Sequence, residues 1–189
     1  MKTKPHVLCL AAVGALTLSA CSTTPAPRAA AAPAAVSTAQ RASIVLMPAS
    51  GSLVSGKLTA TPTADGVRIT GEIGGLQRGG THAIHIHEKG DCSAIDATSA
   101  GSHFNPASQP HGKNGSGPHH GGDMDNIVAN ASGVAKVDVS ASGVTLGGGA
   151  PNDIADRAIV VHAMADDYHT QPAGNAGARV ACGVIKILR

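Results

Sequence analysis

The chain has 189 residues, a formal net charge of +2 and a sequence pI of about 8.4. This near-neutral balance, without a basic run interleaved with aromatic residues, gives no support to nucleic-acid binding. Aromatic residues make up only 1% of the chain, so a folded core must be built from Val, Ile, Leu and Ala.

Residues 1–21 have the pattern of an export signal. A basic start at residues 1–4 precedes an apolar run at residues 7–18 that is too short to span a bilayer. The run ends in Leu18-Ser19-Ala20-Cys21, which looks like a bacterial lipoprotein box in which Cys21 is acylated. The alternative is an ordinary signal peptide cut after Ala20. Both predict an exported protein, and a lipid on Cys21 predicts anchoring to a membrane of the envelope.

Residues 22–42 are rich in Ala, Pro, Ser and Thr and offer almost nothing large enough to bury. Such a segment cannot offset its ordering entropy, so we predict a flexible tether. Ser22 follows Cys21 and is not acidic, which is typical of lipoproteins sorted to the outer membrane. We therefore expect the protein in the periplasm, anchored to that membrane. Residues 43–189 have the length of one domain with a sizeable core.

The domain is predicted to be all-β. The whole chain contains 24 Gly and 11 Pro, and in the domain these turn-forming residues separate short aliphatic runs. No long stretch of the domain repeats at helical period. Asp65-Gly66 predicts a hairpin turn, because Val67, Ile69 and Ile73 alternate after it. The eight expected strands are Ser43–Met47, Leu53–Thr61, Val67–Ile73, Thr81–Glu88, Ile127–Ala131, Ala135–Ser140, Ala158–Ala163 and Val180–Leu188.

Two long irregular stretches interrupt this pattern, between Gly90 and Asp125 and between Asp166 and Ala178. Irregular loops of this length in a compact β domain are usually functional.

Four cysteines are present. Cys9 lies in the signal peptide and Cys21 is the candidate lipid site, which leaves Cys92 and Cys182 in an exported domain. We predict one disulfide between them. The alternative is two buried free thiols.

The segment Thr81–Glu88 carries three histidines on an alternating strand. Successive side chains of a strand point to opposite faces, so His85 and His87 share one face, while His82 lies with the aliphatic residues on the other. His82 is therefore expected to be a structural histidine bonded to the backbone.

Ten histidines are present, and seven of them lie between His82 and His120. This density in Gly-rich loops of an exported protein points to metal binding. Three histidines plus one aspartate suit tetrahedral zinc, an all-imidazole site suits copper or zinc, and two sites sharing a ligand would use them most economically. The candidates beyond the strand are His103, His111, His119, His120, Asp123 and His162.

Five segments together resemble the copper/zinc superoxide dismutases, and Glu88–Ser93 looks like their bacterial branch. The resemblance covers essentially all of the domain and implies an eight-stranded antiparallel Greek-key β-barrel or sandwich with two long functional loops. The segments are His82–Glu88, Ala100–Pro106, His120–Asp123, Val160–Asp167 and Gly174–Ile185.

The resemblance also implies the roles of the site residues, with one copper and one zinc per subunit. Copper is assigned to His85, His87, His103 and His162, and zinc to His103, His111, His120 and Asp123. Asp166 matches the carboxylate that accepts hydrogen bonds from a copper and a zinc histidine. Arg179 matches the guanidinium that attracts superoxide, and Cys92 with Cys182 matches the family disulfide. No family ligand matches His119 or His169, which are expected to be solvated.

The implied activity is dismutation of superoxide to dioxygen and hydrogen peroxide, with copper cycling between Cu(II) and Cu(I), a structural zinc, and His103 as the bridge. An envelope antioxidant enzyme is the natural hypothesis. A non-catalytic copper- and zinc-binding envelope lipoprotein is the alternative. A zinc hydrolase is disfavoured, because no spare carboxylate is placed as a general base. Members of the family associate through different surfaces, so the sequence admits a homodimer without specifying its interface.

Overall fold

The computed structural model describes residues 35–189, whose regular secondary structure is almost entirely β-strand. Their order along the chain is the following: β1 (Ala42–Pro48), β2 (Ser55–Pro62), β3 (Gly66–Gly74), β4 (Thr81–His82), β5 (Ile84–His87), the short 3₁₀ turn η1 (Thr98–Ala100), β6 (Ile127–Val128), β7 (Ala135–Ser142), β8 (Ala158–His162), β9 (Arg179–Val184) and β10 (Lys186–Ile187). The predicted all-β class is confirmed.

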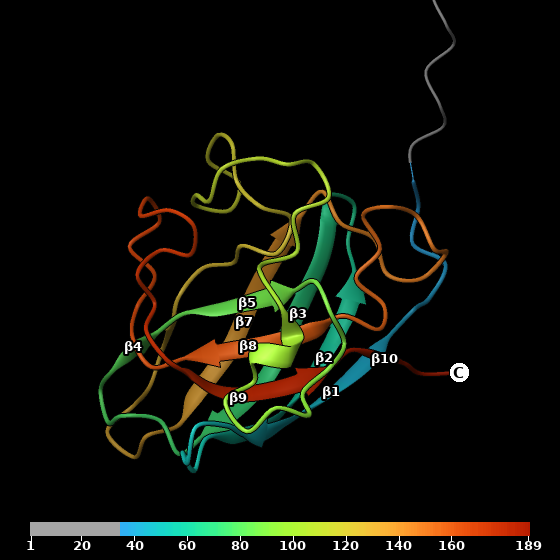
Figure 1. Ribbon diagram of the computed structural model, residues 1–189. Helices are drawn as coiled ribbons and strands as arrows, with labels where there is room; N and C mark the ends of the chain where they lie inside the picture. Colours follow the sequence, from blue (N-terminus) through green and yellow to red (C-terminus); the bar gives the residue numbers. More distant parts are fainter. Residues whose placement is uncertain (1–34) are drawn as a thin grey trace, which may run out of the picture. The chain divides into compact units, whose positions relative to one another are not determined.

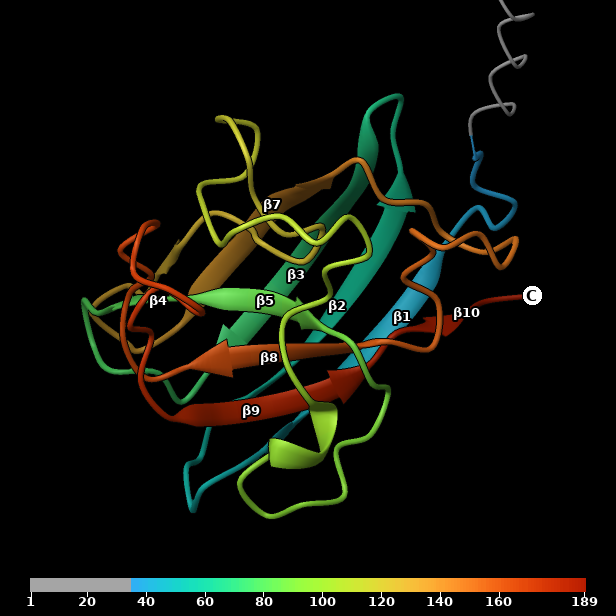
Figure 2. The same ribbon diagram turned by 45° about the horizontal axis from the view of Figure 1, so that its top comes forward.

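The strands form one curled antiparallel sheet in the order β5-β8-β9-β1-β2-β3-β7, with β10 added to β1 and a separate pair of β4 with β6. β5, β8 and β9 lie across β1, β2, β3 and β7 in both views (Figures 1 and 2). β3 pairs with β7 rather than with the next strand in sequence, while β5 lies at the other edge of the sheet. This is the predicted Greek-key barrel.

Alternation of apolar and polar residues explains the sheet. Every second residue of β7 is buried, from Ala135 to Ala141, while the residues between them face solvent. β5 and β8 are instead buried on both faces, because the long loops cover their outer side. The core between the two halves is aliphatic, and Phe104 is its single aromatic residue.

Two predicted strands are interrupted in the structure. Thr81–Glu88 becomes β4 and β5, since Ala83 hydrogen-bonds with Met164 and His162 at the end of β8. Val180–Leu188 becomes β9 and β10, because Ile185 pairs with Asp156 and Arg157 before the chain moves to β1. A change of partner strand therefore breaks both.

The signal peptide, the lipid site Cys21 and most of the predicted tether lie outside the described residues. In the last part of the tether, the main-chain N–H groups of Thr38 and Ala39 donate to Leu146 O (3.1 and 3.0 Å). Over residues 35–189 we find no helix long and apolar enough to cross a membrane.

Candidate metal centre

Four histidine side chains converge beside β5 and β8. Their ligand nitrogens all lie within 4.8 Å of one another, and each side chain is buried. Two come from the outer face of β5, one from the loop after η1 and one from the end of β8: His85, His87, His103 and His162. Alternation on β5 places the first two here and Ile84 and Ile86 in the core.

The outer nitrogens of three of these rings are bonded to the protein, which orients them. His85 Nε2 donates to Asp166 Oδ2 (2.8 Å), His87 Nδ1 to Gly101 O (2.8 Å) and His162 Nδ1 to Gly177 O (3.4 Å). These bonds leave the remaining nitrogen of each neutral ring as an electron-pair donor.

The inner nitrogens of all four rings are buried and have no hydrogen-bond partner among residues 35–189: His85 Nδ1, His87 Nε2, His103 Nε2 and His162 Nε2. Buried polar atoms are normally satisfied, so four orphaned imidazole nitrogens facing one another need an explanation. A copper or zinc ion accepts electron pairs from such a set. The residues present therefore fit a metal.

A second group adjoins the first and shares His103. Its Nδ1 lies 2.9 Å from Asp123 Oδ1, and the Nδ1 atoms of His111 and His120 lie 3.0 and 3.2 Å from the same oxygen. Asp123 is fully buried, and its other oxygen accepts the N–H groups of Gly112 (3.1 Å) and His120 (2.8 Å). Three imidazoles and one carboxylate are a donor set suited to tetrahedral zinc.

Burial keeps three of the four rings of the first group in the protonation state that metal binding requires. It lowers the pKa of His87 to about 2, that of His103 to about 4 and that of His162 to about 3. These rings are thus neutral at neutral pH, and neutral imidazole is the form that binds metal.

In the second group, hydrogen bonds outweigh burial in their effect on the pKa values of His111 and Asp123. Burial alone would lower the pKa of His111, but hydrogen bonds from its two nitrogens to Asp123 and Asp166 raise it to about 9. Burial alone would raise the pKa of Asp123, whereas hydrogen bonds from three histidines hold it far below its usual range. A cation bound here would replace the proton on His111 Nδ1.

Asp166 connects the two groups. Its Oδ2 accepts from His85 Nε2 (2.8 Å) and its Oδ1 from His111 Nε2 (2.9 Å). Asn126 fixes its main chain, because the Asp166 N–H donates to Asn126 Oδ1 (2.8 Å) and Asn126 Nδ2 donates to Asp166 O (2.9 Å). Sequence reasoning missed Asn126, since nothing in a loop asparagine indicates which main chain it will meet.

A cavity of about 470 Å³ opens over the first group. Its walls include Glu88, Pro172, Ala173 and the half-buried Arg179. The guanidinium donates from Nη1 to Ala97 O and from Nη2 to Gly101 O, both at 2.7 Å. Arg179 is the one cationic side chain among the residues lining the cavity, so a small anion would meet it beside the metal.

The predicted disulfide is confirmed. Cys92 and Cys182 are joined with an S–S distance of 2.01 Å. The bond ties the loop that contains Ala97 and Gly101 to β9, which begins with Arg179.

The remaining histidines lie outside both groups. His82 is buried, and its Nδ1 donates to His162 O (3.0 Å), as expected of a structural histidine. His119 Nδ1 donates to His120 O (2.7 Å), and His169 is exposed.

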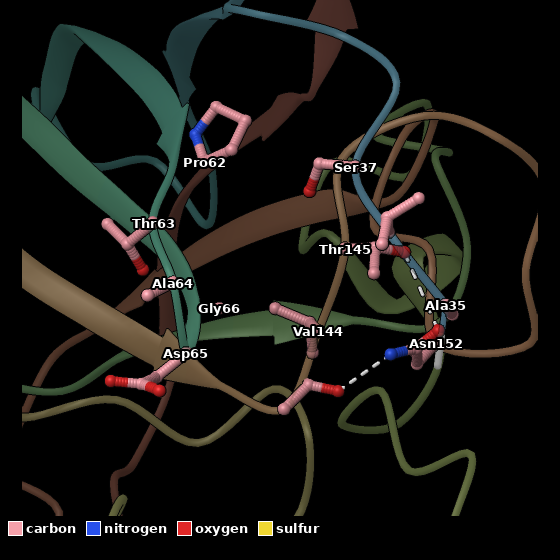
Figure 3. Close-up of a pocket in the computed structure, with 12 residues that line it drawn as sticks. Ala35, Ser37, Pro62, Thr63, Ala64, Asp65, Gly66, Val144, Thr145 and Asn152 are labelled. Carbon is pink, nitrogen blue, oxygen red and sulfur yellow. Dashed lines mark hydrogen bonds between the residues drawn. The ribbon is translucent and has the colours of Figure 1, made fainter. Parts of the chain in front are cut away.

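A separate cavity of about 360 Å³ lies between the N-terminal segment, the β2–β3 turn and the loop after β7 (Figure 3). Small, polar and aliphatic residues line it, and Asp65 is the one charged residue among those that the structure describes there. None of the predicted metal or disulfide residues lines it.

Comparisons with known proteins agree with this geometry. The family model described as copper/zinc superoxide dismutase (SODC) matches residues 54–185. A superoxide dismutase [Cu-Zn] of Caulobacter vibrioides is 45% identical over 137 residues, which is 70% of this chain and 78% of that protein. Superoxide dismutase [Cu-Zn] 2 of Aquifex aeolicus is 43% identical over 137 residues, 70% of this chain and 80% of its own length.

Solved structures show the same fold. A double mutant of a superoxide-dismutase-like protein from Bacillus subtilis superposes with a TM-score of 0.69 at 36% identity, covering 76% of this chain and 96% of that one. The clock protein EA4 superposes with a TM-score of 0.69 at 40% identity, covering 82% of this chain and 98% of that one.

Proposed function

The chain belongs to the copper/zinc superoxide dismutase family, and from this we propose that it dismutates superoxide with copper held by His85, His87, His103 and His162. The observation that carries the proposal is the set of four buried imidazole nitrogens that face one another and have no hydrogen-bond partner in the described part of the chain. One of these rings, His103, also faces the second group, which suits the shared ligand of a copper–zinc pair.

We assign zinc to His103, His111, His120 and Asp123. The carboxylate and the histidine-rich donor set favour zinc there, and the all-imidazole set favours copper in the first group. Asp166 supports both assignments, because it accepts a hydrogen bond from one histidine of each group and so orients both rings.

The reaction joins two superoxide anions and two protons to give dioxygen and hydrogen peroxide. Copper, when bound, supplies a one-electron couple between Cu(II) and Cu(I). Arg179 attracts each anion and orients it by charge-assisted hydrogen bonding, while its bonds to Ala97 and Gly101 hold the guanidinium at the cavity wall. His103 Nε2 is the buried ring atom that could hold a proton for the reduced substrate, provided that zinc in the second group replaces the proton that Nδ1 otherwise shares with Asp123.

We further propose that the enzyme works in the cell envelope, anchored to the outer membrane by a lipid on Cys21. The support is the sequence of residues 1–21 and the Ala- and Pro-rich tether after them. Fatty-acid labelling of the parent and of Cys21→Ala in cells tests the anchor: label on the parent alone is the expected result, and unlabelled parent contradicts it.

One purified sample tests the activity. Copper and zinc content and the rate of superoxide decay are measured together, before and after removal of the metals. We expect decay that depends on copper. A protein that holds both metals but leaves superoxide decay unchanged would instead be a non-catalytic copper- and zinc-binding lipoprotein.

A further inference from the structure

The side chain of Gln171 pairs with the main chain of His111 on a neighbouring loop. The His111 N–H donates to Gln171 Oε1 (2.9 Å), and Gln171 Nε2 donates to His111 O (2.9 Å). Gln171 lies between β8 and β9, whereas His111 lies between β5 and β6, and both loops lie beside β5 (Figure 2). The amide pair therefore fastens one long loop to the other at a residue of the second metal group.

The chain just after Gln171 covers the connection between the two metal groups. Gly174 has a φ of +66°, and a Cβ at this position would lie 1.8 Å from Asp166 Oδ1 and 2.7 Å from His111 Nε2. Its main chain thus packs directly on the hydrogen bond between Asp166 and His111. Glycine is required here because any side chain would displace that bond.

The same short segment forms part of the wall over the first group. Pro172 and Ala173 line the cavity that contains Arg179. Residues 171–174 therefore touch the second group through Gln171, the linking carboxylate through Gly174, and the substrate cavity through the two residues between them.

The position of the His111 main chain matters because its ring has no freedom left. Nδ1 faces Asp123 (3.0 Å) and Nε2 faces Asp166 (2.9 Å), so a small displacement of the main chain would alter the geometry of both contacts. Groups that orient a metal ligand from outside typically change metal affinity by about 10- to 100-fold when they are removed.

We propose that Gln171 is a positioning residue, which latches residues 171–174 onto His111 and thereby sets the zinc affinity of the second group. This inference rests on the proposed zinc site. Gln171 is exposed and makes two neutral hydrogen bonds with His111, beside a longer one from Nε2 to His169 O (3.3 Å), so the lower end of that range applies, roughly tenfold.

The test compares Gln171→Met, which keeps the length of the side chain but loses both hydrogen bonds with His111, with Gln171→Glu, which keeps an acceptor for the His111 N–H. Gln40→Met, at an exposed glutamine just before β1, is the matched control. Zinc affinity is measured by competition with a chelator, the absorption spectrum of bound Co²⁺ reports ligand geometry, and thermal unfolding of the metal-free proteins reports stability. We expect Gln171→Met to bind zinc roughly tenfold more weakly with an altered Co²⁺ spectrum, Gln171→Glu to be intermediate, and Gln40→Met to match the parent.

Equal zinc affinity and equal Co²⁺ spectra in Gln171→Met and Gln40→Met would overturn the latch. So would a loss of affinity in Gln171→Met that is matched by an equal loss of stability in its metal-free form, because Gln171 would then serve the fold alone. Failure of the proposed function looks different: the parent itself would bind neither zinc nor Co²⁺ at the second group, or would not accelerate superoxide decay. If only the inference about Gln171 fails, the parent still binds zinc at the second group and still accelerates superoxide decay.

Discussion

At the scale of single residues, the direction of the second ring nitrogen decides whether a histidine belongs to one metal group or to both. His103 belongs to both, with Nε2 toward the first group and Nδ1 toward Asp123. His162 belongs to the first group alone, because its Nδ1 is directed at the Gly177 carbonyl. Changes at these two positions should therefore have different effects on the two metals.

His162→Ala tests the first group. Removing one of the four proposed copper ligands should abolish copper-dependent superoxide decay, whereas the proposed zinc donors are untouched. Metal content and superoxide decay are measured on the same preparation, and the exposed His169→Ala is the control that should keep both. Copper-dependent decay retained by His162→Ala would contradict the assignment.

Glu88 is an acidic residue on the wall of the cavity through which, under the proposed function, superoxide reaches the first group. Its Oε1 accepts the Ser102 N–H (3.2 Å), a contact that glutamine can also make. We expect Glu88→Gln to raise the rate constant a few-fold at low ionic strength, and the difference to vanish as salt screens the charge. Rates are compared across salt concentrations with Asp138→Asn as a control on β7. An unchanged rate at low salt would show that the charge of Glu88 does not affect the entry of the anion.

At the scale of elements, the strands could be predicted from the sequence, whereas the contacts between the loops could not. Alternation revealed β7 and placed His85 and His87 opposite Ile84 and Ile86, since each strand carries its own burial pattern. The lengths of the two irregular stretches indicated functional loops. The amide pairs made by Asn126 and Gln171 left no local signal, because they depend on which loops meet after the sheet has curled.

The disulfide loop is the element that supports Arg179. The disulfide joins two residues 90 positions apart in the sequence. For a closed loop of that length the chain-entropy model gives a stabilisation of roughly 4 to 5 kcal/mol as an upper value. Replacing Cys92 and Cys182 together by Ser should lower the thermal unfolding midpoint, and should weaken activity by freeing the Ala97 and Gly101 carbonyls that hold the guanidinium.

Thermal unfolding and superoxide decay are measured for the double variant and for the parent, the latter under reducing conditions. The two proteins should give the same values. A double variant with the unfolding midpoint of the oxidised parent would show that the metals and the core hold this loop without the bond.

At the scale of the whole molecule, the buried histidines of the first group make the metal-free protein less stable in acid. His87, His103 and His162 have pKa values of about 2, 4 and 3 in the folded protein because they are buried, against 6.5 in an unfolded chain. As the pH falls below about 6.5, the unfolded chain takes up protons that the folded protein does not. Stability must therefore fall, by up to about 1.4 kcal/mol per pH unit for each of these histidines.

His111 acts in the other direction, but at a different pH. Its pKa is raised to about 9, so its contribution is complete below 6.5 and is lost only as the pH rises through 9. It cannot offset the acid loss. The pKa values of Asp123 and Asp166 are lowered, so these carboxylates add to the loss only at still lower pH.

We expect the metal-free protein to be most stable between these two limits, and its free energy of unfolding to decline steeply from pH 6.5 to pH 4. Urea unfolding at a series of pH values measures the slope. Metal-free His162→Ala should show a shallower decline, since one of the three histidines with a lowered pKa is gone. A free energy of unfolding that stays flat across this range would mean that the rings bind protons in the folded state, and that the first group is not preformed before metal arrives.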